Sequence, residues 1–517
     1  MMAMEVHADR LMLEEVSADA LLVGVFEDDC HPSLYFSRTD HPLAVQLSEL
    51  VAAKEITGKR GEATLVHTFG MIAAKRLLTM GLGKREDLNL ERLRRMAAVC
   101  GRQLRDIHCQ RIAIHLGFLP DDFQKSDTAA AMVEGFLLGQ YQFTKYRQEQ
   151  NQAEIQSFGL YFSIEIDERE MARAIRFGII LALATNFTRD LCNEPGNVLT
   201  PEGFAETSRQ LAAGCGLRCG VLDEQALADK GMNLLLAVGK GSAVPPRLIW
   251  LEYRGAGNGS PVYGLLGKGI TFDAGGLSLK DQASISNMHL DKTAGAMVLG
   301  VIRALIALNA RVNVTGVISA AENMPDGRAY RPGDVIRSYA GRTVEISDTD
   351  AEGRLVMADA LTFMQNDLNI KRIIDVATLT GGAEAAFGPD IIPVMTNTQQ
   401  MADQFIHACA HSGEPAWELP LYKEYREMLD SQIADIVNDV ADGPSTIVSA
   451  LFLNEFIEPG TEWLHLDIAG KEMTEKEKGY IPKGATGVGL RSLIRYFLHL
   501  AGDDIVANGR PRQKLLA

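Results

Sequence analysis

The chain has 517 residues, of which 46% are hydrophobic and 23% charged, and its formal net charge is −16. This balance is typical of a globular protein and excludes a disordered or fibrous chain. The acidic charge disfavours a nucleic-acid or anionic-membrane surface, because phosphate binding requires a basic stripe. The short basic runs at 91–96 and 509–514 are explained more simply as a solvated helix face and a loose tail.

The length predicts more than one domain, since an ordinary domain has roughly 150 residues. The seven cysteines lack CxxC spacing, which argues against a disulfide framework and a zinc–thiolate site. Charged residues near the N-terminus stand where a signal peptide needs an apolar core, and the nearly uncharged run around 176–188 is shorter than the ~20 residues of a membrane span. We therefore expect a cytoplasmic protein without membrane association.

The N-terminal part, residues 1–166, predicts a small α/β domain. Short β-type runs alternate there with helical patterns. The expected strands are 20–26, 76–82 and 111–117, and the expected helices are 89–107 and 128–143. A connecting helix follows at 167–192, and the glycine, prolines and asparagines of 193–201 end it.

The larger C-terminal part, residues 193–517, repeats this alternation. Its expected strands are 247–253, 262–270, 312–320, 372–380, 391–397 and 463–470. Their apolar runs favour strands that are buried on both faces, and hence a mostly parallel central sheet flanked by helices. The predicted fold class is α/β with two domains. In such sheets ligands bind beyond the carboxyl ends of the strands, so the residues that follow these runs are the candidates for chemistry.

The first candidate stretch is GKGITFDAGGLSLK at 267–280, which contains Lys268, Asp273 and Lys280. The spacing is not that of a phosphate-binding GxxxxGK[ST] loop, so its glycines more plausibly allow the backbone to approach a bound group closely. Asp291 precedes a small-residue stretch that predicts a buried helix. Taken alone, Asp291 is more simply explained as a carboxylate at a helix N-terminus than as a metal ligand.

The second candidate stretch is SDTDAEGRL at 347–355, which contains Asp348, Asp350, Glu352 and Arg354. Carboxylates so close together repel one another unless a cation lies between them. Asp273, Asp291, Asp350 and Glu352 all stand at the ends of elements of one predicted sheet. Oxygen-rich sets of this kind suit Mn²⁺, Mg²⁺ or Zn²⁺, whereas His289 alone gives no support for a histidine-dominated zinc site.

Several motifs, in this order and spacing, resemble the leucyl aminopeptidase family of dimetal cytosolic exopeptidases. They include 267–280, the Asp291 segment, ENMPDGRAYRPGD at 322–334 and DTDAEGRL at 348–355. NEPGNVLTP, DVATLTGG, WLHLDIAG and KGATG also have family counterparts, so the resemblance spans roughly 190–500. Two departures are Asp348 in place of the family's asparagine and Lys292 where the family often has methionine.

The resemblance implies a metal-dependent aminopeptidase that removes the N-terminal residue from peptides with a water activated by two divalent ions, Mn²⁺ or Zn²⁺. Asp273 and Glu352 would bridge the two ions, Lys268 and Asp291 would complete one site, and Asp350 would complete the other. Two further residues would act in catalysis. Lys280 would stabilise the oxyanion, and Arg354 would hold a bicarbonate that shuttles the proton.

The resemblance also implies a pocket for the N-terminal side chain, lined by Met288, Thr378, Gly381 and Ala469, with a preference for leucine-like residues. The segment 471–483 is longer and more charged than the family leads us to expect, which weakens that preference. A homohexamer acting on peptide substrates is expected, with nucleic acid a less favoured partner.

Alternatives to these roles remain at the level of the sequence. Arg354 could pair with Asp350 at the start of a helix, and Lys280 could neutralise Asp281 or another neighbour. The function could instead be a different two-metal hydrolysis, for example of phosphoesters, or a binding or regulatory role, since some members of the family bind DNA.

Overall fold

The computed structural model describes residues 4–31, 36–38, 40–148, 154–440 and 442–502. The predicted basic tail at 509–514 lies outside the described residues. The chain forms two compact units, one of residues 1–183 with 476–482, the other of residues 184–475 with 483–517. The division falls within the long helix α4 (Glu168–Asn193).

A six-stranded sheet is the centre of the N-terminal unit. Its strand order is β1-β6-β5-β2-β4-β3, and every neighbouring pair is parallel except β3 and β4. The strands are β1 (Glu5–Arg10), β2 (Ala20–Phe26), β3 (Ala63–His67), β4 (Arg76–Gly83), β5 (Arg111–His115) and β6 (Ser157–Phe162). The three strands predicted in this part are confirmed as β2, β4 and β5.

Three helices accompany this sheet: α1 (Pro42–Ala52), α2 (Leu90–Asp106) and α3 (Lys125–Gly139). The Asn89 side chain caps α2 by accepting a hydrogen bond from the Arg92 amide at 2.9 Å. Residues 476–482, from the charged segment noted above, also belong to this unit. Arg102 pairs there with Glu477 at 2.7 Å and donates to the Gly479 carbonyl at 2.6 Å.

An eight-stranded sheet in the order β15-β14-β17-β13-β9-β10-β8-β7 is the centre of the C-terminal unit. The strands are β7 (Arg218–Leu222), β8 (Arg247–Arg254), β9 (Val262–Asp273), β10 (Asn313–Asn323), β13 (Arg372–Ala377), β14 (Ile392–Thr396), β15 (Ala416–Glu418) and β17 (Glu462–Asp467). The four central strands β17, β13, β9 and β10 are parallel, whereas β8 and β14 run antiparallel to them. The predicted fold class is confirmed.

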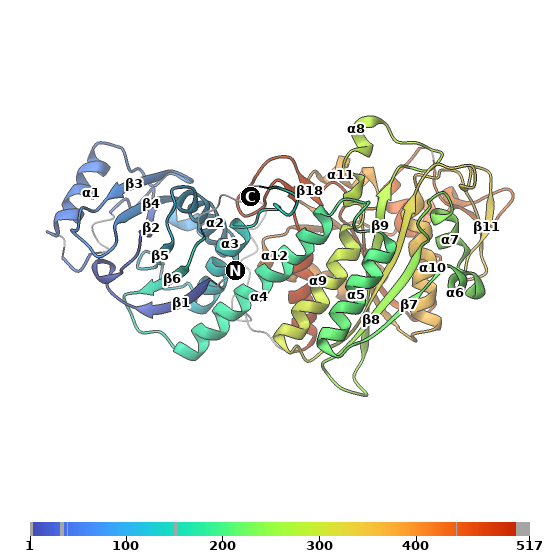
Figure 1. The fold of residues 1–517 in the computed structure, drawn as a ribbon, viewed down its shortest axis with the longest axis horizontal. Helices are drawn as coiled ribbons and strands as arrows, with labels where there is room; N and C mark the ends of the chain where they lie inside the picture. The colour runs from blue at the N-terminus through green and yellow to red at the C-terminus, as the bar shows by residue number, and fades with distance from the viewer. Residues whose placement is uncertain (1–3, 32–35, 39, 149–153, 441, 503–517) are drawn as a thin grey trace. The chain divides into compact units, whose positions relative to one another are not determined.

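Helices cover both faces of this sheet. Figure 1 shows α5 (Pro201–Cys215) and α9 (Thr293–Leu308) on one face and α7 (Asn233–Gly239) and α10 (Glu352–Asn366) on the other. The remaining helices of this unit are α6 (Glu224–Lys230), α8 (Gln282–Ile285), α11 (Gly381–Phe387), α12 (Gln399–Ser412), α13 (Ser445–Asn454) and α14 (Leu490–Leu500). Small sheets form from β11 (Val335–Arg337), β12 (Thr343–Glu345) and β16 (Ile436–Val437), and from β18 (Met473–Thr474) and β19 (Gly484–Ala485).

No described helix is both long and apolar enough to cross a bilayer. All seven cysteines are free thiols, four of them buried.

A buried carboxylate fixes α10 within its unit. Asp359 is fully buried, and its Oδ2 accepts hydrogen bonds from the Leu234 and Leu235 amides at 2.9 and 3.1 Å. Its Oδ1 accepts from the Tyr339 amide at 2.8 Å. Burial raises the pKa of Asp359 to about 7. Because Glu352 is the first residue of α10, this anchoring also fixes the position of Glu352.

We expect Asp359→Ala to lower the free energy of unfolding by at least about 3 kcal/mol, because two buried amides and one partly buried amide lose their acceptor. Calorimetry of the full-length chain measures the fall in unfolding temperature. The control is Asp403→Ala on the exposed side of α12, which should change stability by less than about 0.5 kcal/mol. Equal unfolding temperatures for the two variants would contradict this role for Asp359.

Candidate metal centre

Four carboxylates lie where the central strands and their following helices meet. Asp273 is the last residue of β9, and Glu352 is the first residue of α10, two positions after Asp350. Asp291 follows the short turn η4 (Met288–Leu290) and precedes α9. Asp273, Asp350 and Glu352 each offer an oxygen within 4.8 Å of the other two, the one such group of metal-ligating side chains in the described part of the chain. The predicted carboxylates thus lie together.

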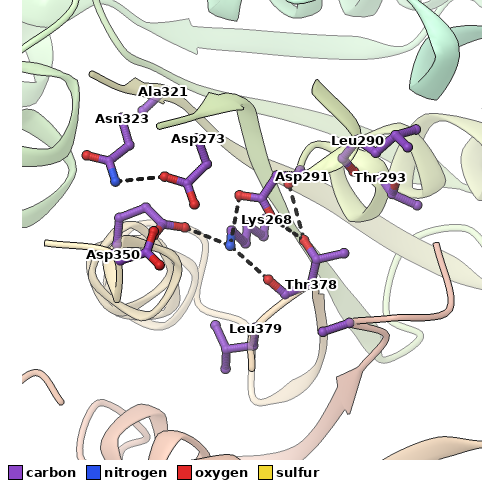
Figure 2. A network of polar contacts seen from close by, with 12 residues as sticks. Lys268, Asp273, Leu290, Asp291, Thr293, Ala321, Asn323, Asp350, Thr378 and Leu379 are labelled. Atoms are coloured by element: carbon purple, nitrogen blue, oxygen red, sulfur yellow. Dashed lines mark hydrogen bonds and ion pairs between the residues drawn. The ribbon is translucent and has the colours of Figure 1, made fainter. Parts of the chain in front are cut away.

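Two lysines lie among these carboxylates. Lys268 Nζ is 3.0 Å from Asp291 Oδ2 and donates to the Thr378 carbonyl at 2.8 Å (Figure 2). It also lies 2.7 Å from Glu352 Oε1. Lys280 Nζ is 2.8 Å from Asp273 Oδ2 and 2.5 Å from Asp350 Oδ1. Lys280 therefore pairs with two members of the cluster, rather than with Asp281 as one alternative proposed.

Burial and like charge act on the pKa values of this group. Burial, with the charges of Asp273 and Glu352, raises the pKa of Asp350 to about 7. The pKa values of Asp291 and Glu352 are raised as well, first by burial. Burial alone would lower the pKa of Lys268, but the surrounding carboxylates outweigh it and raise that pKa. The cluster therefore favours bound positive charge.

Several carboxylate oxygens of the cluster accept no hydrogen bond from the described residues. Asp291 Oδ2, Asp350 Oδ1 and both oxygens of Glu352 are buried and form no hydrogen bond of normal geometry within the described chain. Three of these four oxygens form ion pairs with Lys268 or Lys280. Buried carboxylate oxygens without donors are the ligands that hard and borderline divalent cations prefer, so these residues fit divalent metal ions.

Two glycines allow the close packing at this site. A Cβ atom on Gly353 would lie 2.8 Å from Lys268 Nζ, so α10 could not approach the lysine with a larger residue there. Gly275 has a φ of +84°, and its Cβ would lie 2.8 Å from Asp350 Oδ1. Gly275 thus supports the interpretation of the glycine-rich stretch at 267–280 as a close-approach loop.

Asn323 positions Asp273, a role that the sequence did not suggest. Its Nδ2 donates to Asp273 Oδ1 at 2.8 Å, as Figure 2 shows, and to the Thr349 carbonyl at 2.9 Å. The Tyr330 hydroxyl donates to the same carbonyl at 2.7 Å. The available signal was the register of the sheet: Asn323 ends β10 directly beside Asp273 of β9.

Arg354 is buried at 4% exposure near the start of α10. Its Nη1 donates to the Asn438 carbonyl at 2.5 Å and to Asp439 Oδ1 at 2.8 Å. Among the described residues its ion-pair partner is thus Asp439 rather than Asp350. Its Nε is buried without a hydrogen-bond partner in the same part of the chain, so the two bonds from Nη1 do not use all five N–H donors of the guanidinium.

The two departures from the family pattern have separate partners. Lys292 is fully buried and donates to the Glu194 and His289 carbonyls, both at 2.6 Å. Burial lowers its pKa to about 8. Asp348 Oδ1 accepts from the Asp350 amide at 2.8 Å. Lys292 therefore joins two backbone segments, and Asp348 holds the backbone of the residues just before α10.

The four predicted pocket residues come from three loops. Thr378 follows β13 and donates from Oγ1 to Asp291 Oδ1 at 2.5 Å, Gly381 begins α11, Ala469 follows β17, and Met288 lies in η4. Buried Asp467, which the sequence did not single out, joins two of these loops. It accepts from the Leu379 and Ala469 amides, both at 3.1 Å, and from Thr380 Oγ1 at 2.7 Å.

Known proteins share this architecture. The catalytic domain of the cytosol aminopeptidase family matches residues 186–494, and the N-terminal domain of the same family matches residues 22–150. A probable cytosol aminopeptidase of Geotalea uraniireducens is 42% identical over 480 residues, which cover 92% of this chain and 96% of that protein. The corresponding protein of Aquifex aeolicus is 36% identical over 97% of this chain and 100% of its own length.

Two solved structures extend the comparison. The bottromycin maturation enzyme BotP in complex with Mn is 32% identical, with a TM-score of 0.82 over 94% of this chain and 100% of its own. A mutant of tomato leucine aminopeptidase is 28% identical, with a TM-score of 0.85 over 96% of each chain.

The fold and site thus define a two-domain α/β enzyme whose carboxylate cluster fits divalent metal ions. The chain belongs to the cytosol aminopeptidase family, as the resemblance predicted, and this membership supports aminopeptidase activity.

We expect Asn323→Ala to weaken Mn²⁺ binding by about 10- to 100-fold, because residues that orient metal ligands have effects of that size. Mn²⁺ titration, followed by the rise in unfolding temperature, measures the affinity. Exposed Asn258→Ala is the control and should bind Mn²⁺ as the wild type does. Unchanged affinity in a folded Asn323→Ala variant would show that the Asn323–Asp273 hydrogen bond is dispensable.

Proposed function

We propose that the chain is a dimetal leucyl aminopeptidase, an exopeptidase that hydrolyses the N-terminal, leucine-like residue from peptides. The observation that carries the proposal is the cluster of Asp273, Asp350 and Glu352 with Lys268 and Lys280, in a chain that matches both domains of the family. The two rival functions, phosphoester hydrolysis and a DNA-binding or regulatory role, have no comparable support.

In this proposal Asp273 and Glu352 would be shared by two divalent ions, Lys268 and Asp291 would complete one site, and Asp350 would complete the other. Mn²⁺ is favoured by the complex of BotP, and Zn²⁺ suits the same oxygens. Lys268 can ligate only when it is neutral, and the charge of two dications would lower its pKa accordingly. When bound, the ions would supply an activated water and polarise the scissile carbonyl.

The remaining steps fall to the protein's own side chains. Lys280 reaches both Asp273 and Asp350, so its ammonium is positioned to donate to the oxyanion that develops beside them. Arg354 would bind bicarbonate through its unpartnered Nε, and the bicarbonate would take the water's proton and pass it to the leaving amine. Partly exposed Asp439 holds one edge of the guanidinium and would leave another for the anion.

The N-terminal side chain of the peptide would contact Met288, Thr378, Gly381 and Ala469. Thr378 links this pocket to the metal ligands, because it bonds to both Asp291 and Lys268. We further propose that the enzyme acts in the cytoplasm as a homohexamer, with peptides rather than nucleic acid as its partners. Light scattering tests the hexamer.

We expect the full-length protein to hydrolyse leucine p-nitroanilide, to lose this activity after chelation and to regain it with Mn²⁺ or Zn²⁺, because the proposed nucleophile forms only on the ions. Release of p-nitroaniline measures the rate. Bis-p-nitrophenyl phosphate serves as the comparison substrate. Phosphoester hydrolysis without amide hydrolysis would favour the other two-metal chemistry, and a salt-dependent DNA shift without either activity would favour the binding role.

We expect Lys280→Met to lower kcat for leucine p-nitroanilide by about 10²- to 10³-fold, the usual effect of removing one oxyanion donor. The variant should still show the Mn²⁺-induced rise in unfolding temperature, since it keeps every proposed ligand. Exposed Lys423→Met is the matched control. A kcat within a few-fold of the wild type would refute the role of Lys280 and return it to a charge-neutralising one.

A further inference from the structure

Two of the chain segments that carry proposed pocket residues also carry charged residues; these two segments are called the walls of the pocket below. On one wall Glu472 follows Ala469 by three positions, and on the other Glu384 follows Gly381 by three positions. Residues 471–475 and Lys483 of the charged segment belong to the C-terminal unit, whereas 476–482 belong to the other.

The two walls are in direct contact. Lys471 is 1% exposed, and its Nζ donates to the Ala383 carbonyl at 2.9 Å and to the Ala469 carbonyl at 2.8 Å. A Cβ atom on Gly470 would lie 2.4 Å from Glu384 Cγ, so the Glu384 side chain packs directly on that glycine. The lysine is therefore occupied in joining the walls.

One oxygen of the Glu472 carboxyl has no hydrogen-bond donor in the described part of the chain, although backbone amides of 470–472 donate to the group. The residue is half-buried, and its Oε2 is fully buried without a partner among the described residues. Burial, together with the charge of Glu384, raises the pKa of this carboxyl to about 7. The backbone of Glu472 is ordered, since its carbonyl accepts from the Thr486 amide at 2.9 Å. A buried carboxylate of this kind is stabilised by a cation or donor that reaches it.

We propose that Glu472, supported by Glu384, selects peptides whose N-terminal side chain ends in a cation, lysine or arginine, over those that begin with leucine. This inference rests on the proposed aminopeptidase function and refines its side-chain preference: leucine remains a substrate, but a poorer one than lysine or arginine. The aliphatic stem of such a side chain suits Met288 and Ala469, and its charged end meets the carboxylates. A leucine side chain leaves the carboxylate without a donor, which disfavours leucine at the same site.

The test compares kcat/KM for the p-nitroanilides of leucine, methionine, lysine and arginine with the Mn²⁺-loaded full-length enzyme. We expect Glu472→Met to lower the ratio of lysine or arginine to leucine by at least about tenfold, mainly through KM for the cationic substrates. Glu472→Gln keeps the shape of the side chain and should lower the ratio in the same direction. Exposed Glu475→Gln is the control and should leave the ratio unchanged.

The outcomes separate this inference from the proposed function. If the wild type hydrolyses the leucine substrate but the ratio stays within about twofold in both Glu472 variants, the pocket inference fails and the aminopeptidase stands. If the wild type hydrolyses none of the four, the proposed function fails and the inference with it. The Mn²⁺-induced rise in unfolding temperature shows that each variant is folded and binds metal.

Discussion

The repulsion among Asp273, Asp291, Asp350 and Glu352 is the constraint on which the catalytic unit depends. Carboxylates this close in a buried site are stable only when positive charge lies between them, because the low dielectric strengthens their repulsion. Lys268 and Lys280 supply such charge from the same stretch of chain that carries Asp273. Two dications in the site would neutralise the carboxylates in place of the lysines, which would then be available for ligation and catalysis.

The sheet brings these charges to one place. The parallel strands β9, β10, β13 and β17 end at Asp273, Asn323, Ala377 and Asp467. Two of those terminal residues are part of the cluster's immediate support, Asn323 by holding Asp273 and Asp467 by ordering the loop that contains Thr378. A buried parallel sheet therefore provides both the ligands and the groups that orient them.

Much of this could be predicted from the sequence, because it is local. Apolar runs bounded by turn residues gave β9, β13 and β17 to within a few residues, and clustered charges in SDTDAEGRL indicated a cation site. The direction of β8 could not be predicted, since a run buried on both faces looks the same in parallel and antiparallel pairing.

Other features depend on contacts between residues far apart in the chain. Asp439 approaches Arg354 only through the folded loop after β16, and Asn323 approaches Asp273 only through strand register. The segment 471–483 looks uniform in composition, yet Arg102 holds Glu477 and Gly479 in the N-terminal unit while Lys471 joins the pocket walls in the other. Composition alone cannot divide a charged segment in this way.

The chemistry and the choice of substrate reside in different parts of this structure. The carboxylates and lysines are fixed by strand ends and by the first turn of α10, where a Cβ atom on Gly353 would lie 2.8 Å from Lys268 Nζ. The proposed side-chain pocket lies in η4 and in the loops after β13 and β17, outside the elements that carry Asp273 and Glu352. If both proposals hold, this chain would keep the family's hydrolytic centre while Glu472 would change which N-terminal residue that centre receives.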